Sequence, residues 1–185
     1  EATNKAATGE TAAETTGQLA ANDRLVADTV PWEPVGPRRE PTPRSLLVAN
    51  RLVAALPGHI LGDTFAVLRT RLLKQLADHG FATVMVVSPN PGDGKSTVAA
   101  NLAISISKLT ERRALLVDTD LRCPGVHELF GVTAKPGLAD YLAGTATIDS
   151  CFVDPGIDRL ILLPAGAASA QSAELLAQEI GRAHV

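Results

Sequence analysis

The chain is poor in aromatic and sulfur-containing residues. Aromatic side chains occupy 3% of its 185 positions, which predicts a core of valine, leucine, isoleucine and alanine. Its two cysteines, Cys123 and Cys151, agree with a reducing compartment, and its four histidines lack the spacing of metal ligands. It has no apolar run of about eighteen residues and no signal peptide. We therefore expect a cytoplasmic protein. A net charge of −3 gives no argument for nucleic acid binding, so we expect no nucleic acid partner.

A glycine-rich stretch, SPNPGDGKST from Ser88 to Thr97, lies between two runs of different periodicity. The run before it, ATVMVV at 82–87, predicts a strand buried on both faces of a parallel sheet, and Ser96 to Lys108 predicts a helix. Glycine lets the backbone approach an anion, and the start of a helix adds partial positive charge. This order of strand, loop and helix predicts a nucleoside triphosphate site.

Each residue of this loop has an expected role. Lys95 would reach the β- and γ-phosphates, Ser96 would contact Mg²⁺, and Thr97 would help hold the inner phosphates. The remaining residues expected to line the nucleotide are Pro91, Gly92, Asp93 and Gly94. Pro89 replaces the first glycine of the strict G-x-x-x-x-G-K-[ST] pattern, so an ordinary glycine-proline turn is the alternative. The flanking strand and helix favour the phosphate loop.

A second motif, ALLVDTDLRCP at Ala114–Pro124, ends an apolar run with two carboxylates. Asp118 and Asp120 are one residue apart and are expected to point the same way, at the strand end where open parallel sheets bind ligands. They could hold metal-bound water or accept a proton. The alternative is that Asp118 caps the next segment or a turn. Cys123 follows closely, and a structural thiol is favoured there over a redox-sensitive one.

The two motifs resemble the Walker A and Walker A′ motifs of the bacterial tyrosine kinases of capsule and exopolysaccharide synthesis. The resemblance continues through VHELFGV (Val126–Val132), PGLADYLAG (Pro136–Gly144), LILLPAG (Leu160–Gly166) and ELL (Glu174–Leu176). Related partition-type ATPases carry a lysine five residues before the Walker lysine, where this chain has Asn90, and this difference favours the kinases. The resemblance implies an α/β fold of the P-loop NTPase type, with a mostly parallel sheet flanked by helices.

The resemblance also implies a function: an ATP-dependent protein tyrosine autokinase that regulates polymerisation and export of exopolysaccharide or capsule. Its cofactors would be ATP and Mg²⁺, with Lys95, Asp118 and Asp120 as catalytic residues. Ser96 and the two aspartates would lie at the metal, and which aspartate deprotonates the tyrosine hydroxyl is left open. A membrane chain-length regulator would be the partner and would hold the kinase at the inner face of the plasma membrane. The alternatives are a partition-like ATPase switch without kinase activity and a nonenzymatic module that binds the regulator.

Three parts of the chain are expected. Residues 1–44 are rich in Ala, Thr, Glu and Pro and predict a disordered tail, in which Trp32 is a stray aromatic or a short docking motif. Residues 45–179 would form part of a P-loop nucleotide-binding domain. Residues 180–185, IGRAHV, resemble the translation of a sequencing adapter and are expected to be non-native.

A Walker B strand and a tyrosine-rich tail follow in the resembled family, and neither is present in this sequence. We therefore expect a fragment that is incomplete at its C-terminus, poorly soluble and inactive on its own, because the phosphate-loop strand would lack a neighbour. The single tyrosine, Tyr141, lies in an expected helix and is an unpromising autophosphorylation site.

Ile60–His79 predicts an amphipathic helix that ends at Gly80. Its apolar positions are Leu61, Phe65, Leu68, Leu72 and Leu76. In the resembled family this helix carries a Glu-x-x-Arg-x-x-Arg pattern for subunit association. Here Asp63, Ala66 and Arg69 occupy those places, so assembly into a homo-oligomer stays open.

The other expected elements are short. Ser45–Leu56 is apolar enough for a strand or a short helix, and periodicity does not decide which. Helices are expected near Val126–Phe130 and Leu138–Leu142, a strand at Leu160–Leu163, and a further helix from Ser172. This alternation of strands and helices supports a parallel α/β sheet.

Overall fold

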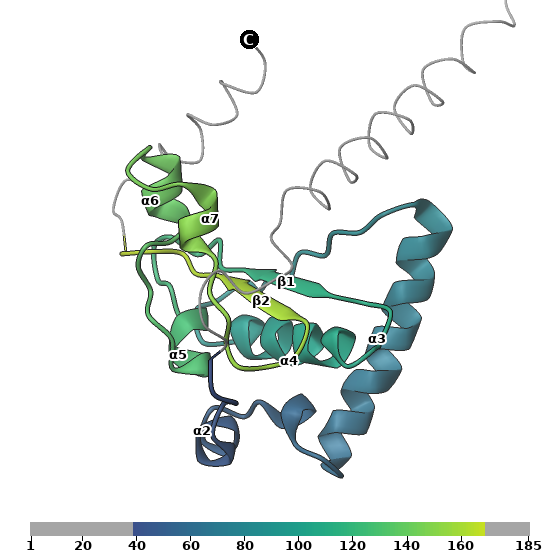
Figure 1. Ribbon diagram of the computed structural model, residues 1–185. Coiled ribbons are helices and arrows are strands. Elements are labelled where there is room, and N and C mark those ends of the chain that lie inside the picture. The colour runs from purple at the N-terminus through teal and green to yellow at the C-terminus, as the bar shows by residue number, and fades with distance from the viewer. Residues whose placement is uncertain (1–38, 169–185) are drawn as a thin grey trace, which may run out of the picture.

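The computed structural model describes residues 39–168, which form nine elements (Figure 1). In chain order these are α2 (Arg44–Ala49), the 3₁₀ helix η1 (Val53–Ala55), α3 (Ile60–His79), α4 (Lys95–Ser107), β1 (Ala114–Val117), α5 (Val126–Phe130), α6 (Leu138–Leu142), α7 (Ile148–Cys151) and β2 (Leu160–Leu163). Trp32, the tail at 180–185 and the helix expected from Ser172 lie outside the described residues. No helix between residues 39 and 168 is long and apolar enough to cross a membrane.

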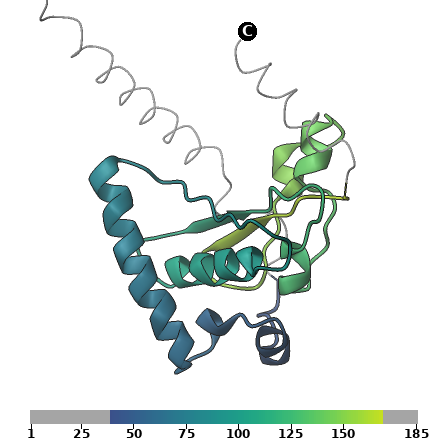
Figure 2. The same cartoon turned by 180° about the vertical axis from the view of Figure 1, so that it is seen from behind.

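Two parallel strands form the centre of the described fold. β1 pairs with β2 from Ala114 opposite Leu160 to Val117 opposite Leu163, and every residue of β2 is buried. α4 lies along one face of this pair, with α3 at one end and α5, α6 and α7 at the other (Figures 1 and 2). Both strands were predicted, and their parallel pairing confirms the α/β class. Their carboxyl ends meet at the end of the sheet where α5 begins.

The prediction of a strand at 82–87 is wrong. This segment runs from the end of α3 to the start of α4 without strand structure (Figure 1), and Met85 and Val87 are 80% and 74% exposed. An apolar β-branched run becomes a strand only where another strand supplies hydrogen-bond partners. Within residues 39–168 the two strands pair with each other and not with this segment, so its backbone stays irregular.

α3 has the predicted bounds, and Gly80 ends it in the left-handed conformation with a φ of 69°. Its predicted apolar face is only partly covered: Phe65 packs against the core, whereas Leu61 and Leu68 are 51% and 42% exposed. The helix contacts α4 and η1, and Arg69 donates a hydrogen bond of 2.7 Å to the carbonyl oxygen of Ser105 in α4. Arg69, which occupies one place of the family's subunit-association pattern, is thus an internal packing residue in this fold.

The N-terminal segment, residues 44–56, is helical: it forms α2 and η1. Buried Leu47, Leu52 and Leu56 join the main hydrophobic core with Ile104 of α4 and Leu162 of β2. A smaller core formed by Leu121, Ala139, Leu142 and Ala165 holds α6 near the carboxyl end of β2. Helices α5 and α6 match their predicted bounds, whereas α7 was not predicted.

Candidate phosphate-binding site

The loop before α4 is folded by its own polar groups. The backbone N–H of Asn90 donates to Oδ2 of Asp93 at 3.1 Å, and the Ser88 hydroxyl donates to the carbonyl oxygen of Asn90 at 3.1 Å. Gly92 and Gly94 have φ values of 85° and 91°, in the left-handed region that glycine favours, and a Cβ atom at either would meet open space. The loop therefore leaves room for a ligand and delivers the chain directly into α4.

Lys95 is the first residue of α4, and its ammonium lies 2.9 Å from Oδ2 of Asp120. The hydrogen bond and charge of Asp120 raise the pKa of Lys95. In turn, the pKa of Asp120 is lowered first by the backbone N–H of Cys123 and then by Lys95. The Lys95 and Asp120 side chains are 31% and 27% exposed, so both charges can be reached from solvent.

Asp118 has a different environment from Asp120, because it is only 4% exposed. Its Oδ1 accepts the backbone N–H of Asp120 at 3.1 Å, while Oδ2 accepts those of Gly125 at 3.1 Å and Val126 at 3.0 Å. Val126 is the first residue of α5. Asp118 therefore holds the turn that carries Asp120 and caps α5, as the alternative interpretation of this residue predicted.

The predicted site residues converge on one end of the sheet. Lys95 and Asp120 are in contact, and the charge of Asp118 is close enough to raise the pKa of Lys95. Ser96 and Thr97 follow Lys95 in the first turn of α4 and are partly buried. Earlier in the loop, before Lys95, the residues Pro91, Gly92 and Asp93 are exposed. The structure thus brings together two motifs that are separate in the sequence, with Lys95 in the first and Asp120 in the second.

Magnesium usually keeps several waters and is held by one or two carboxylates together with substrate phosphates. The partly exposed carboxylate of Asp120, in contact with Lys95 at the start of α4, fits that pattern. Among residues 39–168, no three His, Cys, Asp or Glu side chains are grouped so that they could hold a metal ion. The predicted metal ligands Ser96, Asp118 and Asp120 stay a prediction.

One buried polar residue near the site was not predicted. Asn101 is 1% exposed in α4, and its side chain bonds to Thr97 in the first turn and to the N-terminal segment. The sequence did contain a signal for it, a single asparagine inside the apolar stretch VAANLAI. A polar side chain on a buried helix face needs specific hydrogen-bond partners.

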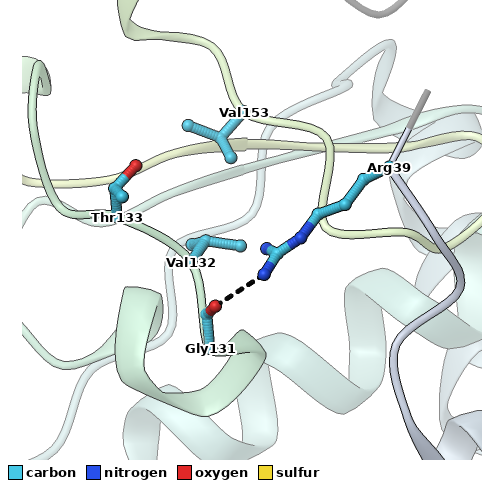
Figure 3. Close-up of a pocket in the computed structure, with 5 residues that line it drawn as sticks. All are labelled: Arg39, Gly131, Val132, Thr133 and Val153. Atoms are coloured by element: carbon cyan, nitrogen blue, oxygen red, sulfur yellow. Dashed lines mark hydrogen bonds between the residues drawn. The ribbon is translucent and has the colours of Figure 1, made fainter. Parts of the chain in front are cut away.

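A pocket of about 430 Å³ lies elsewhere, beside the end of α5 (Figure 3). Its lining residues are Arg39, Gly131, Val132, Thr133 and Val153. The guanidinium of Arg39 points into it and donates a 2.8 Å hydrogen bond to the carbonyl oxygen of Gly131. None of the predicted phosphate-binding residues lines this pocket, and its walls are mostly apolar, so it is not the candidate nucleotide site.

The two cysteines should differ sharply in reactivity. Cys123 is exposed, whereas Cys151 is buried, its thiol lies 3.3 Å from the carbonyl oxygens of Gly137 and Thr147, and burial raises its pKa. Because the thiolate is the reactive form, iodoacetamide should modify Cys123 in the folded protein and both thiols after unfolding. Intact-mass spectrometry would count the adducts. A Cys123→Ser variant should take up no label while folded, and rapid labelling of Cys151 there would contradict the buried position.

Comparison with known proteins finds relatives named as tyrosine-protein kinases. A scan against protein-family models finds no match. The chain is 45% identical over 94 residues to a putative tyrosine-protein kinase EpsB of Ralstonia nicotianae, covering 49% of the chain and 12% of the relative. It is 29% identical over 164 residues to the succinoglycan biosynthesis transport protein ExoP of Rhizobium meliloti, covering 87% and 19%. The kinase domain of the Escherichia coli tyrosine kinase ETK superposes with a TM-score of 0.65 at 25% identity, over 80% of the chain and 55% of that domain.

In sequence and in fold the chain is similar to bacterial tyrosine kinases, as its two motifs predicted. The likeness to a solved kinase domain confirms the predicted α/β fold of the P-loop NTPase type. The chain spans less than a fifth of the length of these two curated relatives, at 12% and 19%. Within this tyrosine kinase fold, Lys95 and Asp120 lie at the phosphate loop and the carboxyl end of β1, the two places where the motifs predicted them.

Proposed function

We propose that this chain is the nucleotide-binding part of an ATP-dependent protein tyrosine kinase that regulates exopolysaccharide or capsule polymerisation and export. The observation that carries the proposal is the contact of 2.9 Å between Lys95, at the start of the phosphate-loop helix, and Asp120, beyond the end of β1. The names of the relatives support it, because they include a tyrosine-protein kinase and a succinoglycan biosynthesis protein.

ATP would be held by the loop and the first turn of α4. The backbone from Pro91 to Gly94 would face the phosphates, and Lys95 would leave Asp120 to bind the β- and γ-phosphate oxygens. Thr97 would hold the inner phosphates. Bound Mg²⁺, held by Ser96 and the aspartates, would neutralise charge on the phosphates. This arrangement places one fixed cation and one metal where charge is redistributed during in-line transfer.

The two aspartates would divide the work. Three backbone N–H groups already contact the Asp118 carboxylate, and it is only 4% exposed, so we assign it to positioning the turn and to the outer surroundings of the metal. Asp120 is more accessible than Asp118: its side chain is 27% exposed, and its carboxylate accepts one backbone N–H, from Cys123, and contacts the ammonium of Lys95. We assign Asp120 to direct contact with the metal and to acceptance of the proton from the incoming tyrosine hydroxyl.

A membrane chain-length regulator would be the partner, and the kinase would act at the inner face of the plasma membrane. The support is the name of one relative, ExoP, which is called a succinoglycan biosynthesis transport protein. Association of several copies through α3 stays a prediction, since Asp63, Ala66 and Arg69 only partly match the pattern of the resembled family.

The proposal is tested by incubating the kinase, expressed from its complete reading frame, with Mg²⁺ and ATP labelled at the γ-phosphate. We expect label on tyrosine, identified by phosphoamino acid analysis. Phosphate release without protein labelling would instead make the protein an ATPase switch, which Asn90 argues against. Binding of a chain-length regulator with neither reaction would make it a nonenzymatic module.

A further inference from the structure

Asn101 connects two parts of the fold that are separate in the sequence. Its Oδ1 accepts the backbone N–H of Ala54 at 2.8 Å. Its Nδ2 donates to the carbonyl oxygen of Arg51 at 2.9 Å and to that of Thr97 at 2.9 Å. Both amide protons and the oxygen are thus used, and a flipped amide would set like groups against each other at all three partners.

The three partners lie at informative places. Thr97 belongs to the first turn of α4, two residues after Lys95, whereas Arg51 and Ala54 belong to the N-terminal segment. Arg51 has a φ of 56°, a left-handed conformation that is uncommon for a residue other than glycine. That conformation presents the Arg51 carbonyl to the buried amide of Asn101.

The burial of this amide makes the connection stiff. Asn101 is 1% exposed, and Leu52 and Ala54 on the N-terminal segment are 0% and 2% exposed. Moving the segment away from α4 would leave buried donors and acceptors unpaired, which is costly in an apolar interior. The segment and the first turn of α4 are therefore expected to move together.

We propose that Asn101 is a positioning residue through which the N-terminal segment, residues 44–56, fixes the phosphate-binding turn of α4. The inference rests on the proposed nucleotide site for its functional consequence. Apart from the ion pair of Lys95 with Asp120, the other side-chain contacts of α4 with the rest of the fold lie beyond that turn: Arg69 bonds to Ser105 and Arg159 bonds to the Ser107 carbonyl oxygen. The Ser107 hydroxyl bonds locally to Ile104. The position of the N-terminal segment thus controls affinity for the nucleotide.

The coupling is tested first in the unmutated kinase, by hydrogen exchange with and without Mg²⁺ and a non-hydrolysable ATP analogue. Because the linkage is reciprocal, analogue bound at the loop should slow exchange of the Ala54 amide by about threefold or more. Unchanged exchange at Ala54, with clear protection of residues 92–97, would overturn the proposal. This arm needs no variant and so does not depend on a mutant protein folding.

The second arm compares Asn101→Ala with Ser107→Ala, a matched variant that removes a buried polar group of the same helix with only a local bond. At a temperature where both are folded, the Asn101 variant should bind the analogue about tenfold more weakly, and the Ser107 variant should match the unmutated protein. Equal affinities would reduce Asn101 to a structural role and contradict the proposal.

Failure of the proposed function would be recognised separately. If the unmutated kinase binds no nucleotide, the site assignment fails, and coupling is then read from exchange without ligand. Asn101→Ala should accelerate exchange both at Ala54 and at residues 98–101, the turn of α4 that follows the phosphate-binding turn. Faster exchange at Ala54 alone would show that the two parts are not coupled.

Discussion

Replacing Lys95 with methionine should lower ATP-dependent tyrosine phosphorylation by about a hundredfold to a thousandfold, because it removes a fixed positive charge from the phosphates in the transition state. Methionine is an unbranched, flexible side chain that fills similar space, so the loss would be one of charge. Lys95 is partly exposed at the start of α4, and the helix should form without it. Labelling with γ-labelled ATP and Mg²⁺ measures the effect.

The same substitution should change how Asp120 titrates. Lys95 is one of the groups that lower the pKa of Asp120, after the backbone N–H of Cys123. In the Lys95→Met variant the pKa of Asp120 should therefore rise, yet stay below its ordinary value because the Cys123 N–H remains. A carbon-detected NMR titration of the Asp120 carboxyl group would measure the change.

The sign of the stability effect follows from that pKa. A carboxyl group whose folded-state pKa is lowered stabilises the fold above its unfolded-state pKa, and this stabilisation is lost as pH falls through the folded-state value. The variant should thus lose a small part of its stability at neutral pH and begin acid unfolding at a higher pH. Solvent around both side chains screens the pair, so the change is modest.

Lys108→Met is the matched control, since Lys108 is an exposed lysine that caps the other end of α4. It should keep full labelling activity and leave the pKa of Asp120 unchanged. Equal loss of activity in the two variants would show that general charge, and not the position of Lys95, matters.

Elements with local signals were predicted with their bounds. Gly80 ends α3 because glycine adopts the left-handed conformation there, and the short helices α5 and α6 follow glycines at 125 and 137. The pairing of Lys95 with Asp120 was also within reach, because the second motif follows the carboxyl end of β1, where open parallel sheets bind ligands, and the phosphate loop was expected beside it.

Features that depend on distant partners were not predicted. The segment at 82–87 has strand-like residues, but a strand requires a neighbour, and neighbours are not visible in local composition. Likewise Asn101 looks like an interruption of an apolar helix until its partners, about fifty residues earlier, are placed beside it. The different environments of Asp118 and Asp120 required the position of α5 as well.

Asparagine substitutions should separate the roles of the two aspartates. Asp118→Asn should destabilise the folded protein by about 2–3 kcal/mol. The new NH₂ group is a donor and would face at least one of the three backbone N–H groups that now donate to the carboxylate, leaving that N–H unpaired. Asp120→Asn should change stability by less than about 1 kcal/mol, since it breaks a partly exposed ion pair that solvent screens. Denaturant unfolding at pH 7 would measure both values.

Kinase activity should show the opposite contrast among folded molecules. Asp120→Asn should reduce tyrosine labelling by about a hundredfold or more, because an amide cannot accept the hydroxyl proton and is a weaker metal ligand. Nucleotide binding without Mg²⁺ should persist or strengthen in this variant, since Lys95 would no longer be held by a carboxylate. Asp158→Asn, a change of an exposed aspartate before β2, is the control and should leave activity intact.

The decisive comparison is the activity of Asp118→Asn at a temperature where the variant is fully folded. If Asp118 acts by holding the turn, its loss should loosen Asp120 and lower activity and stability together, and conditions that restore the fold should restore part of the activity. A variant as stable as the unmutated kinase but inactive would instead place Asp118 at the metal or the proton. Its three N–H contacts and burial favour the first outcome, because an isosteric amide cannot satisfy all of those donors.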